Sequence, residues 1–221
     1  TRKESSAASD VYKRQALGII TEVELRTVPA FLLHARERSE PLDAVVESFV
    51  ERSRAADHLE FSWFPGTDLA LTKENTRLPL TAGIDPVDPV RTAVMDEFLS
   101  HGVFGGMCRL GARAPRLVPL LNQVSARGVD QRTYTDVSYR VFVAERAVRF
   151  REMEYAVPLE RFEEAFAGLR RIAAERAAAG DAVSFPVEVR TVAADDVWLS
   201  TAFGRESAYL AVHRYHREDP T

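Results

Sequence analysis

The sequence has only one cysteine among its 221 residues, Cys108. A single thiol cannot close an internal disulfide, and it cannot supply the several sulfur ligands of a cysteine-based metal site. The five histidines are scattered along the chain, and the closest pair is His213 and His216. On a strand, this spacing of three places the two side chains on opposite faces. The sequence therefore gives poor support for a metal site.

Long hydrophobic runs and blocks of basic residues are also missing. The apolar runs are short and interrupted by charges, so the sequence predicts no transmembrane helix. The polar, charged N-terminus does not resemble a secretory signal peptide. The formal net charge is −4, and without a basic cluster a nucleic-acid partner is not expected. We expect a cytoplasmic protein, and association with a membrane surface stays open.

Hydrophobic residues make up 46% of the chain, which is enough for one sizeable core or two small ones. Residues 1–15 differ from the rest because they are polar. Residues 10–15, Asp-Val-Tyr-Lys-Arg-Gln, resemble the translation of a transposon-derived sequencing adapter. We interpret residues 1–15 as a disordered leader whose origin is a sequencing artefact, and we leave them out of the fold.

From residue 16 onward, the hydrophobic periodicity predicts strands and helices in alternation. The predicted strands are 21–28, 31–36, 58–64, 68–73, 137–143, 146–157, 187–191 and 206–216. The predicted helices are 41–55, 90–104, 108–127 and 159–179, with Gly105 and Gly106 between the middle two and with Pro115 and Pro119 breaking the third. Residues 75–88 are predicted to be a loop. This order indicates an α+β fold, with one mainly antiparallel sheet and helices packed on one face.

The stretch from Phe185 to Arg205 carries the strongest functional signal. Val187 and Val189 alternate with Glu188 and Arg190, which places the acid and the base side by side on one face of a strand. Such a face either runs along the surface or lines a polar pocket. Taken alone, a Glu-x-Arg pair is more often a solvated ion pair.

Four motifs resemble those of sugar-1,4-lactone oxidases (aldonolactone oxidases) and alditol oxidases, which are flavoenzymes of the vanillyl-alcohol-oxidase type. The motifs are Glu188-x-Arg190, Trp198-Leu-Ser, Phe203-Gly-Arg-Glu and Met153-Glu-Tyr. The resemblance extends over residues 16–216. It implies the last strand of a truncated FAD-binding domain at 16–28, a substrate-binding cap domain at 29–216 and a polar tail at 217–221.

The resemblance also implies roles for individual residues. Arg190 would stabilise the negative charge of reduced flavin, and Glu188 would accept hydrogen bonds from substrate hydroxyls and hold Arg190 in place. His213 would contact the substrate from the neighbouring strand, although a spectator role is equally open. Glu154 could approach the site, but we expect it to form a structural ion pair.

The implied reaction is transfer of a hydride from a sugar-1,4-lactone, such as an arabinono-, gulono- or galactonolactone, or from an alditol to FAD. The acceptor that reoxidises the flavin would be oxygen or another compound. Gly18, Ile19 and Ile20 would run past the cofactor, although Gly18 could equally be an ordinary turn or bulge glycine.

The glycine-rich flavin domain of that family and its C-terminal His-Trp-x-Lys segment do not occur in this sequence. We therefore expect this chain alone neither to bind flavin tightly nor to turn over. The alternative function is a stand-alone α+β binding or dimerisation module without redox activity.

Overall fold

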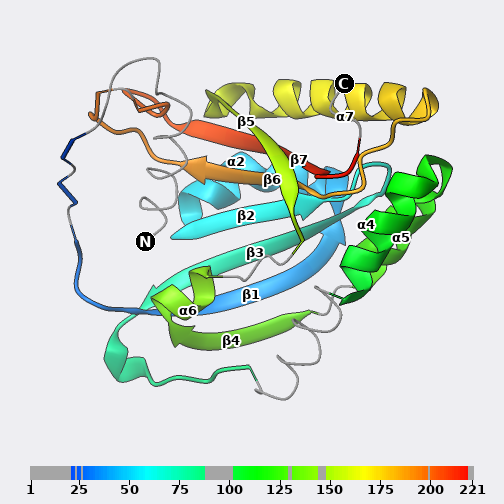
Figure 1. Cartoon of the computed structure of the whole chain (residues 1–221). Helices are drawn as coiled ribbons and strands as arrows, with labels where there is room; N and C mark the ends of the chain where they lie inside the picture. The colour runs from blue at the N-terminus through cyan, green and yellow to red at the C-terminus, as the bar shows by residue number, and fades with distance from the viewer. Residues whose placement is uncertain are drawn as a thin grey trace.

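The computed structural model describes residues 21–22, 24–25, 27–87, 102–128, 131–143, 148–198 and 200–218. Within these ranges, seven strands form one sheet in the order β4-β1-β3-β2-β6-β7-β5 (Figure 1). The strands are β1 (Leu32–Pro41), β2 (His58–Trp63), β3 (Leu69–Leu78), β4 (Arg132–Val137), β5 (Phe150–Pro158), β6 (Val187–Val192) and β7 (Ser207–Tyr215). All neighbouring strands in this sheet are antiparallel. The predicted α+β class with a mainly antiparallel sheet is confirmed.

Two helices, α2 (Leu42–Ala55) and α7 (Phe162–Ala178), cover one face of the sheet. The main core lies between them and the inner strands. It comprises Leu42, Val45, Phe49, Leu59, Phe61, Trp63, Ala70, Leu159, Phe162, Phe166, Val187, Val189, Ala208 and Leu210. Rings from the two helices meet rings from β2, with Phe49 5.1 Å from Phe61 and Phe166 5.5 Å from both Phe61 and Trp63. Because aromatic side chains bury large apolar areas, this cluster fixes both helices on the sheet.

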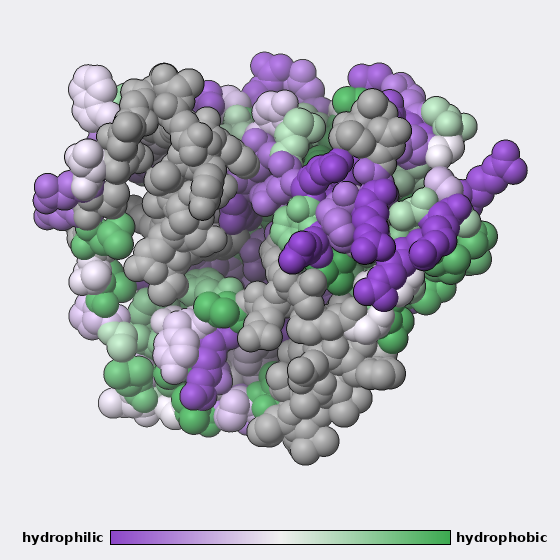
Figure 2. Space-filling model, viewed as in Figure 1, coloured by the Kyte–Doolittle hydropathy of each residue, from purple (hydrophilic) through white to green (hydrophobic). Residues whose placement is uncertain are grey.

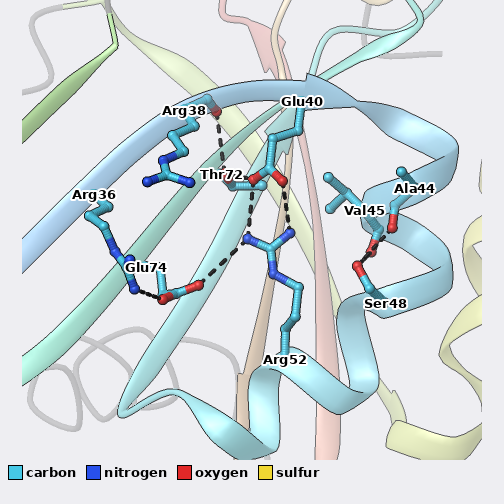
Figure 3. Close-up of polar contacts among 9 residues, drawn as sticks. All are labelled: Arg36, Arg38, Glu40, Ala44, Val45, Ser48, Arg52, Thr72 and Glu74. Atoms are coloured by element: carbon cyan, nitrogen blue, oxygen red, sulfur yellow. Dashed lines mark hydrogen bonds and ion pairs between the residues drawn. The ribbon is translucent and has the colours of Figure 1, made fainter.

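Polar contacts attach α2 to the strands beside it (Figure 3). The Arg52 guanidinium donates two hydrogen bonds of 3.1 Å to the carboxylate of Glu40 on β1, and it lies 3.6 Å from Glu74 on β3. The Thr72 hydroxyl donates to the same Glu40 carboxylate. Burial by itself would raise the pKa of Glu40, but the bonds from Thr72 and Arg52 outweigh burial and lower the pKa. The C-terminal half of the helix is therefore held to two strands at once.

Among the described residues, helices lie over the opposite face of the sheet only at its ends. At one end, α4 (Phe104–Arg113) packs Cys108 against Phe185 and Tyr215. At the other end, α6 (Ser138–Phe142) packs Val141 on a cluster formed with Leu33, Ala35 and Tyr134. The predicted packing of helices on one face thus describes α2 and α7, while α4 and α6 leave the middle of the second face open. We call this second side the open face.

Glu37 ties three strands together on the open face. Its carboxylate lies 3.2 Å from Nζ of Lys73 on β3, and it accepts a 2.5 Å bond from Nε of Arg132 on β4. The hydroxyl of Tyr134, also on β4, donates a third bond of 3.0 Å. Burial alone would raise the pKa of Glu37, but the two cations outweigh it and hold the pKa below the ordinary value of 4.5.

Several predicted elements are confirmed. The helices α2 and α7 and the hairpin of β2 and β3 lie where periodicity placed them, and the hairpin turns at Gly66 with a positive φ of 84°. The expected break near Pro115 is also present. The short η4 (Pro115–Leu117) separates α4 from α5 (Val118–Arg127).

Three predicted boundaries are wrong. Residues 75–78 belong to β3 rather than to a loop, because β1 pairs with β3 along its whole length. Residues 138–142 form the helix α6 rather than a strand, and the strand in this region, β4, ends immediately before them. A short apolar run does not distinguish these two states. Gly105 and Gly106 lie inside α4, where a Cβ on Gly105 would meet Val148 at 3.5 Å.

Other expectations fall partly or wholly outside the described ranges. The described residues among 21–28 belong to no strand, since no described segment pairs with them. The domain assignments of residues 1–15, 16–28 and 217–221 stay predictions. Residues 90–101, most of the predicted helix 90–104, also lie outside the described ranges. Helical spacing from Phe162, Phe166 and Leu169 predicts that Ile172 is buried, but its side chain is 50% exposed and Ala173 packs on the core instead. Each helix that the structure describes is too short or too polar to cross a bilayer.

We expect Phe166→Ala to destabilise the chain by about 3–5 kcal/mol, because it leaves a cavity among tightly packed rings. Ile172→Ala on the same helix is the matched control, and its effect should stay within about 0.5 kcal/mol. Urea denaturation of both variants measures the difference. Equal losses in the two variants would contradict the packing of α7.

We expect the free energy of unfolding to fall as the pH drops below about 4.5, and Glu37→Gln to weaken this dependence. The folded-state pKa of Glu37 is lowered, so its contribution is present above the unfolded-state pKa and is lost as the pH falls through the folded-state pKa. Denaturation midpoints between pH 3 and pH 7 measure the slope, with exposed Glu163→Gln on α7 as the control. An unchanged slope in Glu37→Gln would contradict the assignment.

Candidate functional site

The alternation along β6 places its charged residues on the open face. Val187 and Val189 are buried in the core on the other side. Glu188 and Arg190 lie directly opposite Ser62 and Glu60 of β2, and opposite Ala211 and Tyr209 of β7. The predicted pair therefore lies in the interior of the sheet, between two neighbouring strands, and not at an edge.

Glu188 and Arg190 line a groove that crosses the inner strands. The groove has a volume of about 220 Å³ and is bordered by Glu37, Arg38, Glu60, Phe61, Ser62, Leu71, Thr72, Lys73, Glu188, Val189 and Arg190. Figure 2 shows hydrophilic residues around a hollow in the middle of this side of the molecule. Of the two readings that the sequence left open, surface pair or polar pocket, the structure supports the pocket.

A second hollow, of about 680 Å³, lies between the β2–β3 turn, α5 and α7. It is larger and its wall mixes apolar residues with charged ones such as Asp43, Asp68 and Arg170, but it contains none of the predicted site residues. We therefore place the candidate site in the groove on the open face.

Arg190 is held mainly by a residue from another strand. Its Nη2 donates a 2.6 Å bond to the carboxylate of Glu154 on β5, and the two side chains are 23% and 10% exposed. The guanidinium also lies over the ring of Tyr209, 5.6 Å from its centroid. The hydroxyls of Tyr209 and Thr201 are hydrogen-bonded to each other. The expected ion pair of Glu154 is confirmed, and its partner is Arg190. That Glu188 also holds Arg190 in place stays a prediction.

His213 lies on the open face but does not border the groove. Its side chain is 2% exposed and packs edge-on against Phe150, 4.8 Å between ring centroids, in the cluster beneath α4. Nδ1 donates to the Pro186 carbonyl at 3.1 Å, and Nε2 lies 3.9 Å from Glu152. In this arrangement the imidazole is enclosed by protein, so its contact with substrate stays a prediction.

Sequence reasoning missed a row of charges across the open face. Arg190, Glu60, Lys73, Glu37 and Arg132 occupy directly opposed positions on β6, β2, β3, β1 and β4. Their signs alternate, and opposite charges facing each other on antiparallel strands stabilise the pairing by about 0.2–1 kcal/mol each. The sequence signal that could have revealed part of this row is the alternation in β2, where charged and hydroxyl residues stand between Leu59, Phe61 and Trp63.

The groove suits a small, neutral, hydrogen-bonding ligand. On the open face, the charged side chains that border it are the acidic Glu37, Glu60 and Glu188 and the basic Lys73 and Arg190, whereas Arg38 belongs to the opposite face. Because acids and bases alternate along the wall, the groove does not call for a strongly charged ligand. Its volume lies below the roughly 300–1,000 Å³ of drug-sized pockets. Carboxylates accept hydrogen bonds while arginine and lysine only donate them, so the wall offers both kinds of partner to hydroxyl groups.

Two other kinds of site find no support in the described part of the chain. Cys108 is buried, and burial raises the pKa of its thiol to about 12, which disfavours the nucleophilic thiolate. Within the same residues, no group of three or more metal-ligating side chains comes together. The predicted cofactor residues Gly18, Ile19 and Ile20 lie outside the described residues.

The sequence relatives of this chain are named for activities on sugar lactones. L-gulono-1,4-lactone dehydrogenase of Mycobacterium tuberculosis is 37% identical over 200 residues, which are 90% of this chain and 45% of that protein. L-gulonolactone oxidase of Scyliorhinus torazame is 23% identical over 211 residues, with 90% and 44% covered. The chain thus spans less than half the length of these relatives.

Solved structures share the fold at low sequence identity. The crystal structure of cholesterol oxidase from B. sterolicum superposes with a TM-score of 0.63 at 15% identity, covering 85% of this chain and 43% of that one. A solvent-stable cholesterol oxidase gives a TM-score of 0.62 at 13% identity over 85% and 43% of the two chains. These similarities concern the fold alone.

The family model for D-arabinono-1,4-lactone oxidase matches residues 23–221, which include every strand of the sheet and the whole groove. The match extends over far more than half of the chain, and it agrees with the relatedness to the mycobacterial lactone dehydrogenase. The chain belongs to the D-arabinono-1,4-lactone oxidase family.

Proposed function

We propose that this chain is the substrate-binding domain of an FAD-dependent oxidoreductase that oxidises a sugar-1,4-lactone or an alditol. Arabinono-, gulono- and galactonolactone are the lactones that we consider first. The observation that carries the proposal is the polar groove that Glu188 and Arg190 line in a member of a lactone oxidase family. A lactone or an alditol is small, uncharged and rich in hydroxyls, which matches the volume and the hydrogen-bonding side chains of the groove.

In this proposal, the chain binds and orients the substrate. Glu188 accepts hydrogen bonds from substrate hydroxyls, which fixes the carbon to be oxidised relative to the cofactor. Arg190 donates hydrogen bonds, and its permanent charge stabilises negative charge that develops beside it. Glu154 keeps the guanidinium in one orientation through their 2.6 Å bond, so little reorganisation is needed when the substrate arrives.

The described residues fit one side of an FAD site. Bound FAD would supply the acceptor for the hydride that leaves the substrate carbon. Arg190 offers a partly exposed cation on the open face, which suits the electron-rich edge of a flavin ring. We propose that the remaining cofactor contacts come from Gly18, Ile19 and Ile20 and from parts of the full-length protein outside the described residues. The reoxidising acceptor would be oxygen or another compound.

A stand-alone binding or dimerisation module is the second candidate. It is favoured by exposed apolar side chains: Met153 and Tyr155 of the edge strand β5 are 54% and 61% exposed, and Trp198 is 86% exposed. Exposed patches of this kind mark interaction surfaces. The two candidates differ in whether lactones reduce a flavin bound by the full-length protein.

We expect Arg190→Lys in the full-length protein to lower kcat/KM for its lactone by roughly 10²-fold, because lysine cannot reproduce the planar fork that contacts Glu154 and the ligand. Anaerobic stopped-flow absorbance measures the rate of flavin reduction. Arg171→Lys, an exposed position on α7, is the control and should match the wild type. Wild-type rates in Arg190→Lys would contradict the role of Arg190.

We also expect the full-length protein to purify with the absorbance spectrum of a bound flavin, whereas residues 1–221 alone carry no stoichiometric flavin. The reason is that the described residues contact only one side of the cofactor. Absorbance spectra and the flavin released by heat denaturation measure both ratios. One flavin per chain in the present protein would refute this division of the site.

A further inference from the structure

Strand β2 contributes a second pair of polar residues to the groove. Glu60 lies directly opposite Arg190, and Ser62 lies directly opposite Glu188. All four residues border the same hollow. The pair was not among the predicted site residues, because nothing in the local pattern of β2 indicates which strand will lie beside it.

The four residues form a square of alternating hydrogen-bonding character. Arg190 only donates, the carboxylates of Glu60 and Glu188 accept, and the Ser62 hydroxyl does both. The two carboxylates occupy diagonal corners, with the donor and the hydroxyl at the other two. This pattern offers acceptors at two separate points, as a ligand with several hydroxyl groups requires.

Positively charged residues lie opposite Glu60 on both neighbouring strands. The row of alternating charges sets Glu60 between Arg190 on β6 and Lys73 on β3. Lys73 is itself anchored, since its Nζ lies 3.2 Å from Glu37 and donates a 2.8 Å bond to the Val141 carbonyl. Residues of opposite charge that face each other across strands stabilise the pairing, so an acidic residue is favourable at this position of the sheet.

We propose that Glu60 and Ser62 bind substrate hydroxyls and that Glu60 determines the selectivity for a polyhydroxylated substrate. This inference rests on the proposed function and extends it to a second strand. An ionised carboxylate forms stronger hydrogen bonds than a neutral acceptor. A site built to bind a substrate hydroxyl rejects the analogue that lacks it, because the buried polar group then loses its partner.

The test measures KM and kcat of the full-length enzyme for its lactone and for a set of mono-deoxy lactones, each lacking one hydroxyl. In Glu60→Gln, KM for the full lactone should rise roughly tenfold or more, with a smaller change in kcat. For the deoxy lactone that lacks the contacted hydroxyl, KM should be nearly the same in wild type and variant. Ser62→Ala should show the same pattern across the lactones, with a smaller rise in KM for the full lactone.

The controls separate binding from support of the sheet. Glu163→Gln, exposed on α7, should keep the wild-type KM for every lactone, and melting temperatures should show that Glu60→Gln is folded. If Glu60→Gln does not fold, Ser62→Ala carries the same comparison. A KM that rises by one common factor for all lactones, or that does not change, would overturn the inference.

The wild-type enzyme separates this inference from the proposed function. If no lactone or alditol reduces its bound flavin, the proposed function and this inference fail together. If the wild type is active and discriminates between full and deoxy lactones while Glu60→Gln and Ser62→Ala discriminate equally well, only this inference fails.

Discussion

The strict alternation of side chains across the inner strands is the constraint on which the rest of the structure depends. Successive residues of β2 and β6 point to opposite faces, so burying Phe61 and Val189 beneath α2 and α7 forces Glu60 and Arg190 onto the open face. A slip of one residue in this pairing would move the charges into the core and the valines into the groove. The same register of strand pairing therefore fixes both the core and the candidate site.

Charges are tolerated in the interior of the sheet because they are compensated across strands and remain partly hydrated. Within the described part of the chain, α4 and α6 cover only the ends of the open face, and the residues between them border a polar groove. Glu37 joins β4, β1 and β3, and Glu154 joins β5 to β6 through Arg190. The same contacts that stabilise the pairing of strands hold the candidate site in one geometry. The candidate site residues Glu188 and Arg190 therefore lie on a strand whose position is fixed by these contacts.

Family membership and groove chemistry support each other. The family is named for the oxidation of a sugar lactone, and the groove is small and lined with acids and bases that supply both acceptors and donors. The similarity to cholesterol oxidases is structural only. A shared fold thus occurs in proteins named for very different substrates, so the fold alone does not indicate the substrate.

The sequence by itself determined the elements whose signal is local. Period-two alternation placed Glu188 and Arg190 on one face of a strand, and helical periodicity located α2 and α7. Its failures are also physical. The short apolar run that forms α6 fits either period, and the two glycines at 105–106 remain helical although glycine has a low helix propensity, because tertiary context overrides a local preference. Only the tertiary structure decided which strands became neighbours, because pairing joins residues far apart in sequence. That pairing brought Glu60 and Glu154 to Arg190 and enclosed His213 under α4.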